Sequence, residues 1–444
     1  MLHTIILGDM CNMRCAYCLE HSKDYRNTIK FEYIERYLTL LFGEANVFKQ
    51  NKDDYQLLDL VGGEPLLYMD IIRKTTNLYA SLLRDNGYMA PHIHIFTNGY
   101  LIDRDEVQDY LHAWKDHLIL GVSMDGIASM HNKTRTLING DPTFDKIYNN
   151  LKQIPCNFMI QMTLDPRNIE EYAETRKFFC EAGYQLQTGI NCTNPDWGTW
   201  GYKVYYEQVK KFFDWYRNHS SEWILQHRFF FTDRNFRPRF IDACFNTIMC
   251  NEVEGIMLDY DGTVIPCISC SAVAAKEHRP NFGNIMSDVD WEAARYIPRY
   301  GDFDLDIKSE CYVCPVGTNN CKPCIYAKDV YCTQAEQGRK YLCNILMLLH
   351  LEFVLFNNYW ITIYKEKYPD EKPTIKDGAI SYNNVPVLDI LVSKTWALEV
   401  LTEEEYNYLV DLTLSLGGKV NPIKTKHFTL EQAEEFTKYL KQTR

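Results

Sequence analysis

The stretch "CNMRCAYCLE", residues 11–20, places three cysteines at the spacing C-x3-C-x2-C. It follows "HTIIL", residues 3–7, a short apolar run typical of a buried strand. Three thiolates on a short loop can bind three irons of a cubane iron–sulfur cluster and leave the fourth iron open to another ligand. A structural zinc site would need a fourth protein ligand, which His21 could supply. This stretch alone leaves both interpretations open.

Strand-like and helix-like segments alternate from the start of the chain to residue 191. After residues 3–7, the further strand candidates are 56–61, 92–96, 118–124, 157–164 and 184–190. Amphipathic helices fit between them at 31–42 and 103–115, and Asp103 with Glu106 has the spacing of a capping box. Such alternation predicts a parallel sheet, either open and doubly wound or closed into a partial barrel.

Composition limits the kinds of partner. A chain of 444 residues suggests one large domain with one or two smaller ones. The formal net charge of −12 argues against nucleic acid as the main partner, because phosphate binding needs a basic surface. The first ten residues lack the basic region of a signal peptide, so we expect a cytoplasmic protein. The most apolar stretch, 345–364, contains His350 and Glu352, which favours a buried helix over a membrane span.

The sixteen cysteines are unevenly distributed. Three precede residue 20, and ten fall between residues 244 and 343. Without an export signal, such a cluster favours metal or redox chemistry in a reducing compartment over disulfides. We therefore expect residues 244–343 to be organised by metal, since they have little conventional core.

The cysteine loop and its surroundings resemble the radical S-adenosylmethionine (radical SAM) superfamily. That family has C-x3-C-x2-C with an aromatic residue, here Tyr17, before the third cysteine. Further stretches agree in order: "GGEP" (62–65), "TNG" (97–99), "SMDG" (123–126) and "HNKTR" (131–135). The resemblance decides between the two sheets, because it implies an α/β fold with a partial (β/α)6 TIM-like barrel.

The resemblance also implies a site. Cys11, Cys15 and Cys18 would hold a [4Fe–4S] cluster whose open iron chelates SAM, which an electron from the cluster cleaves to methionine and a 5′-deoxyadenosyl radical. Glu64 would accept from the ammonium group of SAM, and the glycines before it would let the backbone approach closely. The residues implied to contact SAM are Tyr17, Gly62, Gly63, Glu64, Asn98, Ser123, Asp125 and Arg135.

The later cysteines resemble a SPASM domain, which carries two auxiliary [4Fe–4S] clusters. The first auxiliary cluster would use Cys244, Cys250, Cys267 and Cys324, and the second Cys311, Cys314, Cys321 and Cys343. The chain has x6 and x2 around Cys321 where the family often has x5 and x3, a departure that bears on how Cys321 and Cys324 divide between the two clusters. The alternative is a zinc ribbon over residues 311–324, which would leave the other four cysteines without a role.

The family implies a function as well. Radical SAM enzymes with a SPASM domain mostly modify peptides or proteins, so we expect an oxidoreductase of the maturase type, related to anaerobic sulfatase-maturing enzymes and ribosomal-peptide maturases. Its partners would be a peptide or protein substrate and an electron donor such as flavodoxin or ferredoxin. Ile268 stands where sulfatase-maturing relatives carry an aspartate base, which counts against formylglycine formation. The alternatives are a small-molecule or cofactor-precursor substrate, and a zinc-stabilised scaffold without catalysis.

The expected domains are a barrel core at 1–191, a connecting segment at 192–243, a SPASM domain at 244–343 and a mostly helical extension at 344–444. Because the barrel begins at once, we expect no N-terminal peptide-recognition domain. The extension would then bind substrate, unless a separate protein does so and the extension only covers the barrel. The catalytic base stays unassigned, with Asp259, Asp261 and several tyrosines as candidates by their nearness to Cys267 in the sequence.

Overall fold

The computed structural model of the chain describes residues 2–18, 26–184, 186–190, 199–227, 255–266, 281–295, 336–376, 379–390, 394–398 and 400–420. It divides into two compact units. The sheet unit consists of residues 1–168, 184–193 and 252–302, and the helical unit consists of residues 169–183, 194–251 and 303–444.

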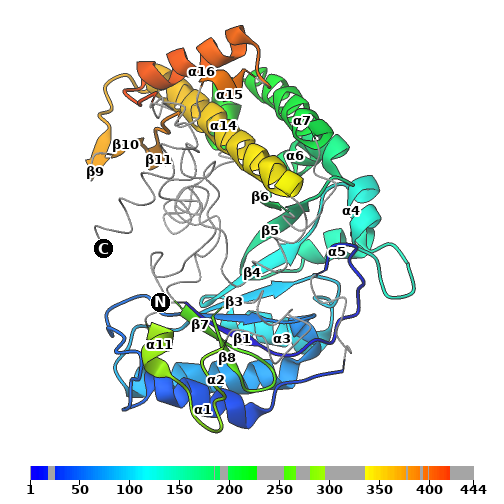
Figure 1. Cartoon of the computed structure of the whole chain (residues 1–444), viewed down its shortest axis with the longest axis vertical. Helices are drawn as coiled ribbons and strands as arrows, with labels where there is room; N and C mark the ends of the chain where they lie inside the picture. The colour runs from blue at the N-terminus through cyan, green and yellow to red at the C-terminus, as the bar shows by residue number, and fades with distance from the viewer. Residues whose placement is uncertain are drawn as a thin grey trace. The chain divides into compact units, whose positions relative to one another are not determined.

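An eight-stranded sheet forms the centre of the sheet unit (Figure 1), in the order β6-β5-β4-β3-β2-β1-β7-β8. All neighbouring pairs are parallel except β7 with β8. The strands are β1 Leu2–Ile6, β2 Leu57–Val61, β3 His92–Thr97, β4 Leu118–Ser123, β5 Asn157–Leu164, β6 Leu186–Ile190, β7 Gly255–Leu258 and β8 Val264–Ile265. This parallel arrangement confirms the partial barrel fold, and the six expected strands are all present.

Helices pack on one face of these strands. They are α1 Phe31–Phe42, η1 Pro65–Leu67, α2 Met69–Asp85, α3 Asp105–Trp114, α4 Ala128–Thr134, α5 Phe144–Leu151 and α11 Trp291–Arg295. The helix α1 has the bounds that its apolar spacing predicts, and it buries Ile34, Tyr37 and Leu38 completely. Alternate residues of the strands, such as Ile93 and Ile95 of β3, are also fully buried. The core therefore lies between the sheet and its helices.

The expected capping box before α3 is wrong. Arg104 occupies the N-cap position, and no side chain caps the helix. The carboxylate of Asp103 instead lies 3.2 Å from Lys146 Nζ. Asp103 thus lies one residue before the N-cap position, and its carboxylate forms an ion pair with Lys146 of α5.

Strands β7 and β8 were not expected, because the cysteine-rich composition around them suggested metal rather than sheet. The turn expected at "DYDGT" does join them, and Gly262 adopts the left-handed φ of +84° that this turn requires. The parallel pairing of β7 with β1 extends the sheet beyond the six strands of the alternating pattern.

The helical unit contains η2 Ile169–Glu171, α6 Tyr172–Glu181, α7 Thr199–Arg217, α8 Ser221–Gln226, α14 Glu336–Lys367, α15 Lys394–Ala397 and α16 Glu403–Ser415. Its longest helix, α14, lies along α7 and α16 (Figure 1). The helix expected at 345–364 lies within α14, and most of its described side chains are buried. None of the helices in the described part of the chain is long and apolar enough to cross a membrane.

A small antiparallel sheet in the extension was not expected either. It comprises β9 Thr374–Lys376, β10 Ala379–Tyr382 and β11 Val385–Pro386. Asn383 and Asn384 form the two-residue turn between β10 and β11, both with positive φ. Asparagine tolerates that backbone region, so the pair Asn-Asn was the available sequence signal for this hairpin.

Candidate functional site

The cysteine loop runs from Leu7 to Cys18 and lies at the carboxyl end of β1. Backbone hydrogen bonds fix it on two sides. On one side, Gly63 N donates to Gly8 O at 3.0 Å and Glu64 N donates to Met10 O at 2.8 Å. On the other side, Arg14 N donates to Thr136 O at 2.9 Å, and Ala16 N donates to Thr134 O at 2.8 Å. The structure thus brings the cysteine loop together with "GGEP" and with the segment after α4.

The two glycines of "GGEP" are required by this close approach. A Cβ on Gly63 would lie 2.3 Å from Met10 O, and one on Gly62 would lie 2.7 Å from Gly8 O. Gly62 also has a φ of +149°, which other residues rarely adopt. In this structure the glycines therefore allow the cysteine loop to pack against the end of β2.

The carboxylate of Glu64 is fully buried and already accepts three hydrogen bonds from the protein. The donors are Leu66 N at 3.0 Å, the hydroxyl of Thr97 at 2.6 Å and Asn98 N at 2.7 Å. Burial raises the pKa of the Glu64 carboxyl, and these three bonds oppose that rise. Glu64 therefore ties the loop after β2 to the loop after β3.

Asn98, at the end of β3, faces the first cysteine. Its Nδ2 donates to Asn12 Oδ1 at 2.8 Å and lies 3.9 Å from Cys11 Sγ. The backbone N of Met13 also donates to Cys11 Sγ, at 3.4 Å. Two neutral donors thus point at this sulfur.

A second cluster of buried polar groups surrounds Asp125, just beyond β4. Its carboxylate is fully buried and accepts from the Tyr17 hydroxyl at 2.5 Å, the Thr134 hydroxyl at 2.6 Å and Thr163 N at 3.0 Å. Arg135 Nε lies 3.0 Å from the same carboxylate. Arg135 Nη1 in turn lies 3.8 Å from Cys15 Sγ, so this cluster connects the second cysteine to β4 and β5.

His131 supports that cluster from behind. Its Nδ1 accepts Asp125 N at 3.1 Å, and its Nε2 lies 3.0 Å from the hydroxyl of Thr143, which donates to Arg135 O at 2.9 Å. Burial lowers the pKa of His131 to about 4, so the ring is neutral near pH 7. The sequence stretch "HNKTR" contained this histidine, but nothing in it marked His131 as the support of Asp125 and Arg135.

Ser123 ends β4 and is partly exposed. It lies opposite Gln161 of β5, and Gln161 Nε2 donates to Gln187 Oε1 of β6 at 3.3 Å. The two glutamines were not singled out from the sequence. Alternate polar residues along β5, with Gln161 and Thr163 two apart, were the signal for a polar strip here.

The pKa values of two of these cysteines bear on which group the loop can hold. Partial burial, reinforced by the charge of Glu64, raises the pKa of Cys11 to about 12, and burial raises that of Cys15 to about 11. Thiolates in this place therefore need a compensating cation, which an iron–sulfur cluster supplies. Within the described residues, no three His, Cys, Asp or Glu side chains gather as ligands of one metal ion. A cubane does not need this, because each thiolate binds a separate iron.

Most of the expected auxiliary ligands lie outside the described residues, as do His21 and Ile268. These ligands are Cys244, Cys250, Cys267, Cys311, Cys314, Cys321 and Cys324. Cys343 lies on α14, but its side chain is not described. Of the base candidates, Asp259 accepts Tyr260 N and Asp261 accepts Thr263 N, so both carboxylates serve the β7–β8 turn.

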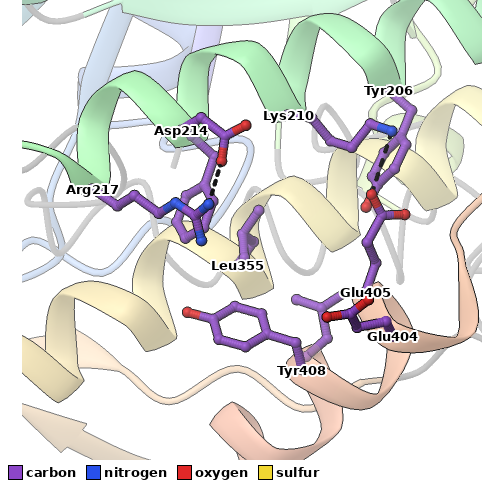
Figure 2. Close-up of a pocket in the computed structure, with 10 residues that line it drawn as sticks. Tyr206, Lys210, Asp214, Arg217, Leu355, Glu404, Glu405 and Tyr408 are labelled. Atoms are coloured by element: carbon purple, nitrogen blue, oxygen red, sulfur yellow. Dashed lines mark ion pairs between the residues drawn. The ribbon is translucent and has the colours of Figure 1, made fainter.

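A separate pocket lies within the helical unit (Figure 2), between α7, α14 and α16, with a cavity volume of about 340 Å³. The aromatic side chains of Tyr206, Phe213 and Tyr408 line it. Ion pairs stand at its edge: Lys210 with Glu405 at 3.3 Å, and Arg217 with Asp214 at 2.8 Å.

A family model matches the part of the chain that contains the cysteine loop and the strand-end loops around it. Residues 5–179 match the family model of the Radical SAM superfamily, so the chain carries a radical SAM domain.

Two curated relatives and one solved structure show which proteins this chain is similar to. The cysteine-type anaerobic sulfatase-maturating enzyme of Clostridium perfringens is 25% identical over 287 residues, which is 58% of this chain and 71% of that enzyme. The enzyme of the same name from Clostridium novyi (strain NT) is 25% identical over 199 residues, 42% of this chain and 49% of that enzyme. The solved structure of native anSMEcpe with bound AdoMet has a TM-score of 0.56 at 20% identity, covers 79% of this chain and 99% of its own, and shows a shared fold.

Proposed function

We propose that this radical SAM enzyme is an oxidoreductase that modifies a peptide or protein. The observation that carries the proposal is the convergence of the cysteine loop with three strand-end loops, joined by the buried carboxylates of Glu64 and Asp125. The relatives named above act as sulfatase-maturating enzymes, and one solved structure of anSMEcpe holds AdoMet together with a Cp18Cys peptide. A peptide or protein is therefore the substrate class best supported for this chain.

In the proposed site, Cys11, Cys15 and Cys18 hold a [4Fe–4S] cluster. When bound, the cluster and SAM supply a 5′-deoxyadenosyl radical that removes a hydrogen atom from the substrate. The backbone of Gly62 and Gly63 and the side chain of Ser123 lie on the loops proposed to hold SAM. We infer that Glu64 and Asp125 serve SAM mainly by placing these loops, because each carboxylate already accepts three hydrogen bonds from protein donors.

The proposal extends to residues 244–343, with two auxiliary clusters on the eight cysteines assigned above. The first auxiliary cluster would take the electron that the substrate radical loses and a base would take the proton, giving a net two-electron oxidation. Ile268 favours a product other than formylglycine, such as a crosslink. Between α7 and the extension, the pocket of the helical unit offers aromatic faces and both signs of charge, a lining that suits a peptide side chain.

The test is an anaerobic preparation, reconstituted with iron and sulfide, reduced with dithionite and supplied with SAM. We expect about twelve irons per chain with acid-labile sulfide, and 5′-deoxyadenosine detectable by mass spectrometry. The control is the variant Cys11→Ala/Cys15→Ala/Cys18→Ala, which should lose about four irons and all product. Zinc without sulfide would support the scaffold alternative. A candidate peptide encoded beside this gene should lose two hydrogen atoms, whereas turnover of small molecules alone would contradict the peptide assignment.

A further inference from the structure

A buried charge pair lies beside one of the three cysteines. The side chain of Arg135 is 9% exposed and that of Asp125 is not exposed, and Arg135 Nε lies 3.0 Å from Asp125 Oδ1. The same guanidinium places Nη1 3.8 Å from Cys15 Sγ and lies 5.3 Å from the centre of the Tyr17 ring. The Nε of the guanidinium therefore lies beside the carboxylate, while Nη1 lies beside the sulfur.

We propose that Arg135 and Asp125 set the reduction potential of the cluster held by Cys11, Cys15 and Cys18, with opposite signs. This inference rests on the proposed function, because it needs the cluster. Hydrogen bonds to cluster sulfurs and nearby charges are among the main determinants of iron–sulfur potentials. A cation beside Cys15 stabilises the reduced cluster, which carries one more negative charge, and a carboxylate destabilises it.

Burial makes this effect large at Cys15. A charge in a poorly hydrated place acts through a lower effective dielectric constant than one at the surface. Cys11, by comparison, is contacted by the neutral donors Met13 N at 3.4 Å and Asn98 Nδ2 at 3.9 Å, and the negative charge of Glu64 also acts on it. Arg135 thus puts a full positive charge beside Cys15, in contrast to the neutral donors that contact Cys11.

The two members of the pair can be removed separately. In Asp125→Asn, Oδ1 can still accept Thr163 N, and the hydroxyls of Tyr17 and Thr134 can accept from the new amide, because a hydroxyl both donates and accepts. Arg135→Gln leaves Asp125 without its cation, and the double variant Arg135→Gln/Asp125→Asn restores local neutrality. The double variant thus remains informative where the arginine variant alone folds poorly.

A matched control is Arg167, which contacts the same cysteine loop. Arg167 Nε lies 2.6 Å from Asp165 Oδ1, and Arg167 Nη1 donates to the carbonyl oxygen of Ala16 at 3.3 Å. Its side chain is 39% exposed, so its charge is better screened. Arg167→Gln removes the same charge from the cysteine loop without removing the contact to Cys15.

The experiment is a redox titration of the fully loaded protein without SAM, followed by electron paramagnetic resonance. The signal missing from the Cys11→Ala/Cys15→Ala/Cys18→Ala variant belongs to this cluster. We expect a more negative midpoint potential in Arg135→Gln, a less negative one in Asp125→Asn, an intermediate one in the double variant and no change in Arg167→Gln.

Shifts of the same sign in Arg135→Gln and Asp125→Asn, or no shift in either, would overturn the inference while leaving the proposed function intact. A wild-type protein with no reducible cluster at these cysteines would overturn both. Measuring without SAM separates this role from contact between Arg135 and SAM, which would change SAM affinity but not the potential of the SAM-free cluster.

Discussion

The buried carboxylate of Glu64 accepts the backbone amide of Asn98 at 2.7 Å, which joins the carboxyl ends of β2 and β3. The same carboxylate accepts hydrogen bonds from the hydroxyl of Thr97 and from Leu66 N, so it holds the two loops together. Because "GGEP" is also bonded to the cysteine loop, a displacement at β3 reaches the cysteines through Glu64.

Glu64→Gln should therefore destabilise the protein. The NH2 group of the glutamine would face at least one of the three groups that donate to Glu64, so at least one hydrogen bond is lost. Losing a bond to a charged acceptor lowers the free energy of unfolding by about 2 kcal/mol. We expect a lower melting temperature of the loaded protein and weaker SAM binding. The control is Thr97→Val, which keeps the carboxylate but removes the donor at Thr97 and the acceptor for Gly99 N; it should cost less, because two of the three bonds to Glu64 remain. Normal stability with lost SAM binding would instead support direct contact between Glu64 and the SAM ammonium group.

Gly63→Ala should disturb the cysteine loop itself. The added Cβ would meet Met10 O at 2.3 Å and Asp9 O at 2.7 Å, both of them backbone atoms that cannot turn aside. We expect less iron bound per chain after reconstitution and little 5′-deoxyadenosine. The control is Gly189→Ala on β6, where the nearest atom to an added Cβ is Met162 O at 3.8 Å. Full iron loading in Gly63→Ala would show that the loop can shift at little cost.

The sequence predicted the elements whose signals are local. The bounds of α1 and β5 agree residue for residue with their apolar patterns, and the stretches that resembled a radical SAM site meet at one end of the sheet. It could not predict which atoms the buried carboxylates contact. Leu66 N, Asn98 N and Thr163 N are backbone donors, and backbone donors carry no sequence signature. The β7 strand was missed because its four residues have too little periodicity to outweigh the cysteines around them.

His3 predicts a pH dependence of stability. Its ring is fully buried on β1, and its Nε2 lies 3.1 Å from Gln50 Oε1. Burial lowers the pKa of His3 to about 4. An unfolded chain binds a proton near pH 6.5, whereas the native chain resists protonation down to about pH 4. The neutral ring of His3 therefore contributes roughly 3 kcal/mol to the free energy of unfolding. This contribution is complete when the pH is above the pKa of the unfolded chain, and it is lost as the pH falls toward the pKa of the folded chain.

His3→Gln should make the stability profile less steep between about pH 6.5 and about pH 4, because glutamine does not titrate and can still donate to Gln50. Part of the slope should remain, since burial also lowers the pKa of His131 to about 4. The measurement is the melting temperature across that range. His112→Gln, on the exposed surface of α3, is the control and should keep the wild-type slope. Parallel slopes for wild type and His3→Gln would mean that His3 is not the group responsible.

The pocket in Figure 2 gives a test of the extension. Tyr408 lines it and is 40% exposed, so its truncation should cost little stability. If the pocket receives a peptide side chain, Tyr408→Ala should raise KM for the peptide several-fold with little change in kcat, since it removes uniform binding. The control is Tyr368→Ala just beyond α14, a residue 45% exposed and not among the pocket lining. Unchanged KM in Tyr408→Ala would favour the extension as a cover for the core.

Glu352, the acidic residue that argued against a membrane span, is the acceptor of a buried network between α6, α7 and α14. Its carboxylate accepts hydrogen bonds from the hydroxyl of Tyr172, at 2.9 Å, and from the hydroxyl of Tyr205. Arg176 Nη2 lies 3.3 Å from the same carboxylate. Glu352→Gln would remove the negative charge 3.3 Å from the buried Arg176 Nη2, and breaking a buried ion pair typically costs about 3–5 kcal/mol. We expect a large loss of thermal stability, partly recovered in Glu352→Gln/Arg176→Met.

The control for this network is the pair of Lys177 with Glu174 on the same helix α6, 2.7 Å apart with the glutamate 62% exposed. Glu174→Gln should cost less than about 1 kcal/mol, as surface pairs do. The comparison is made by denaturant titration of each variant beside wild type. Equal losses in Glu352→Gln and Glu174→Gln would show that water reaches the network, and that burial does not set its strength.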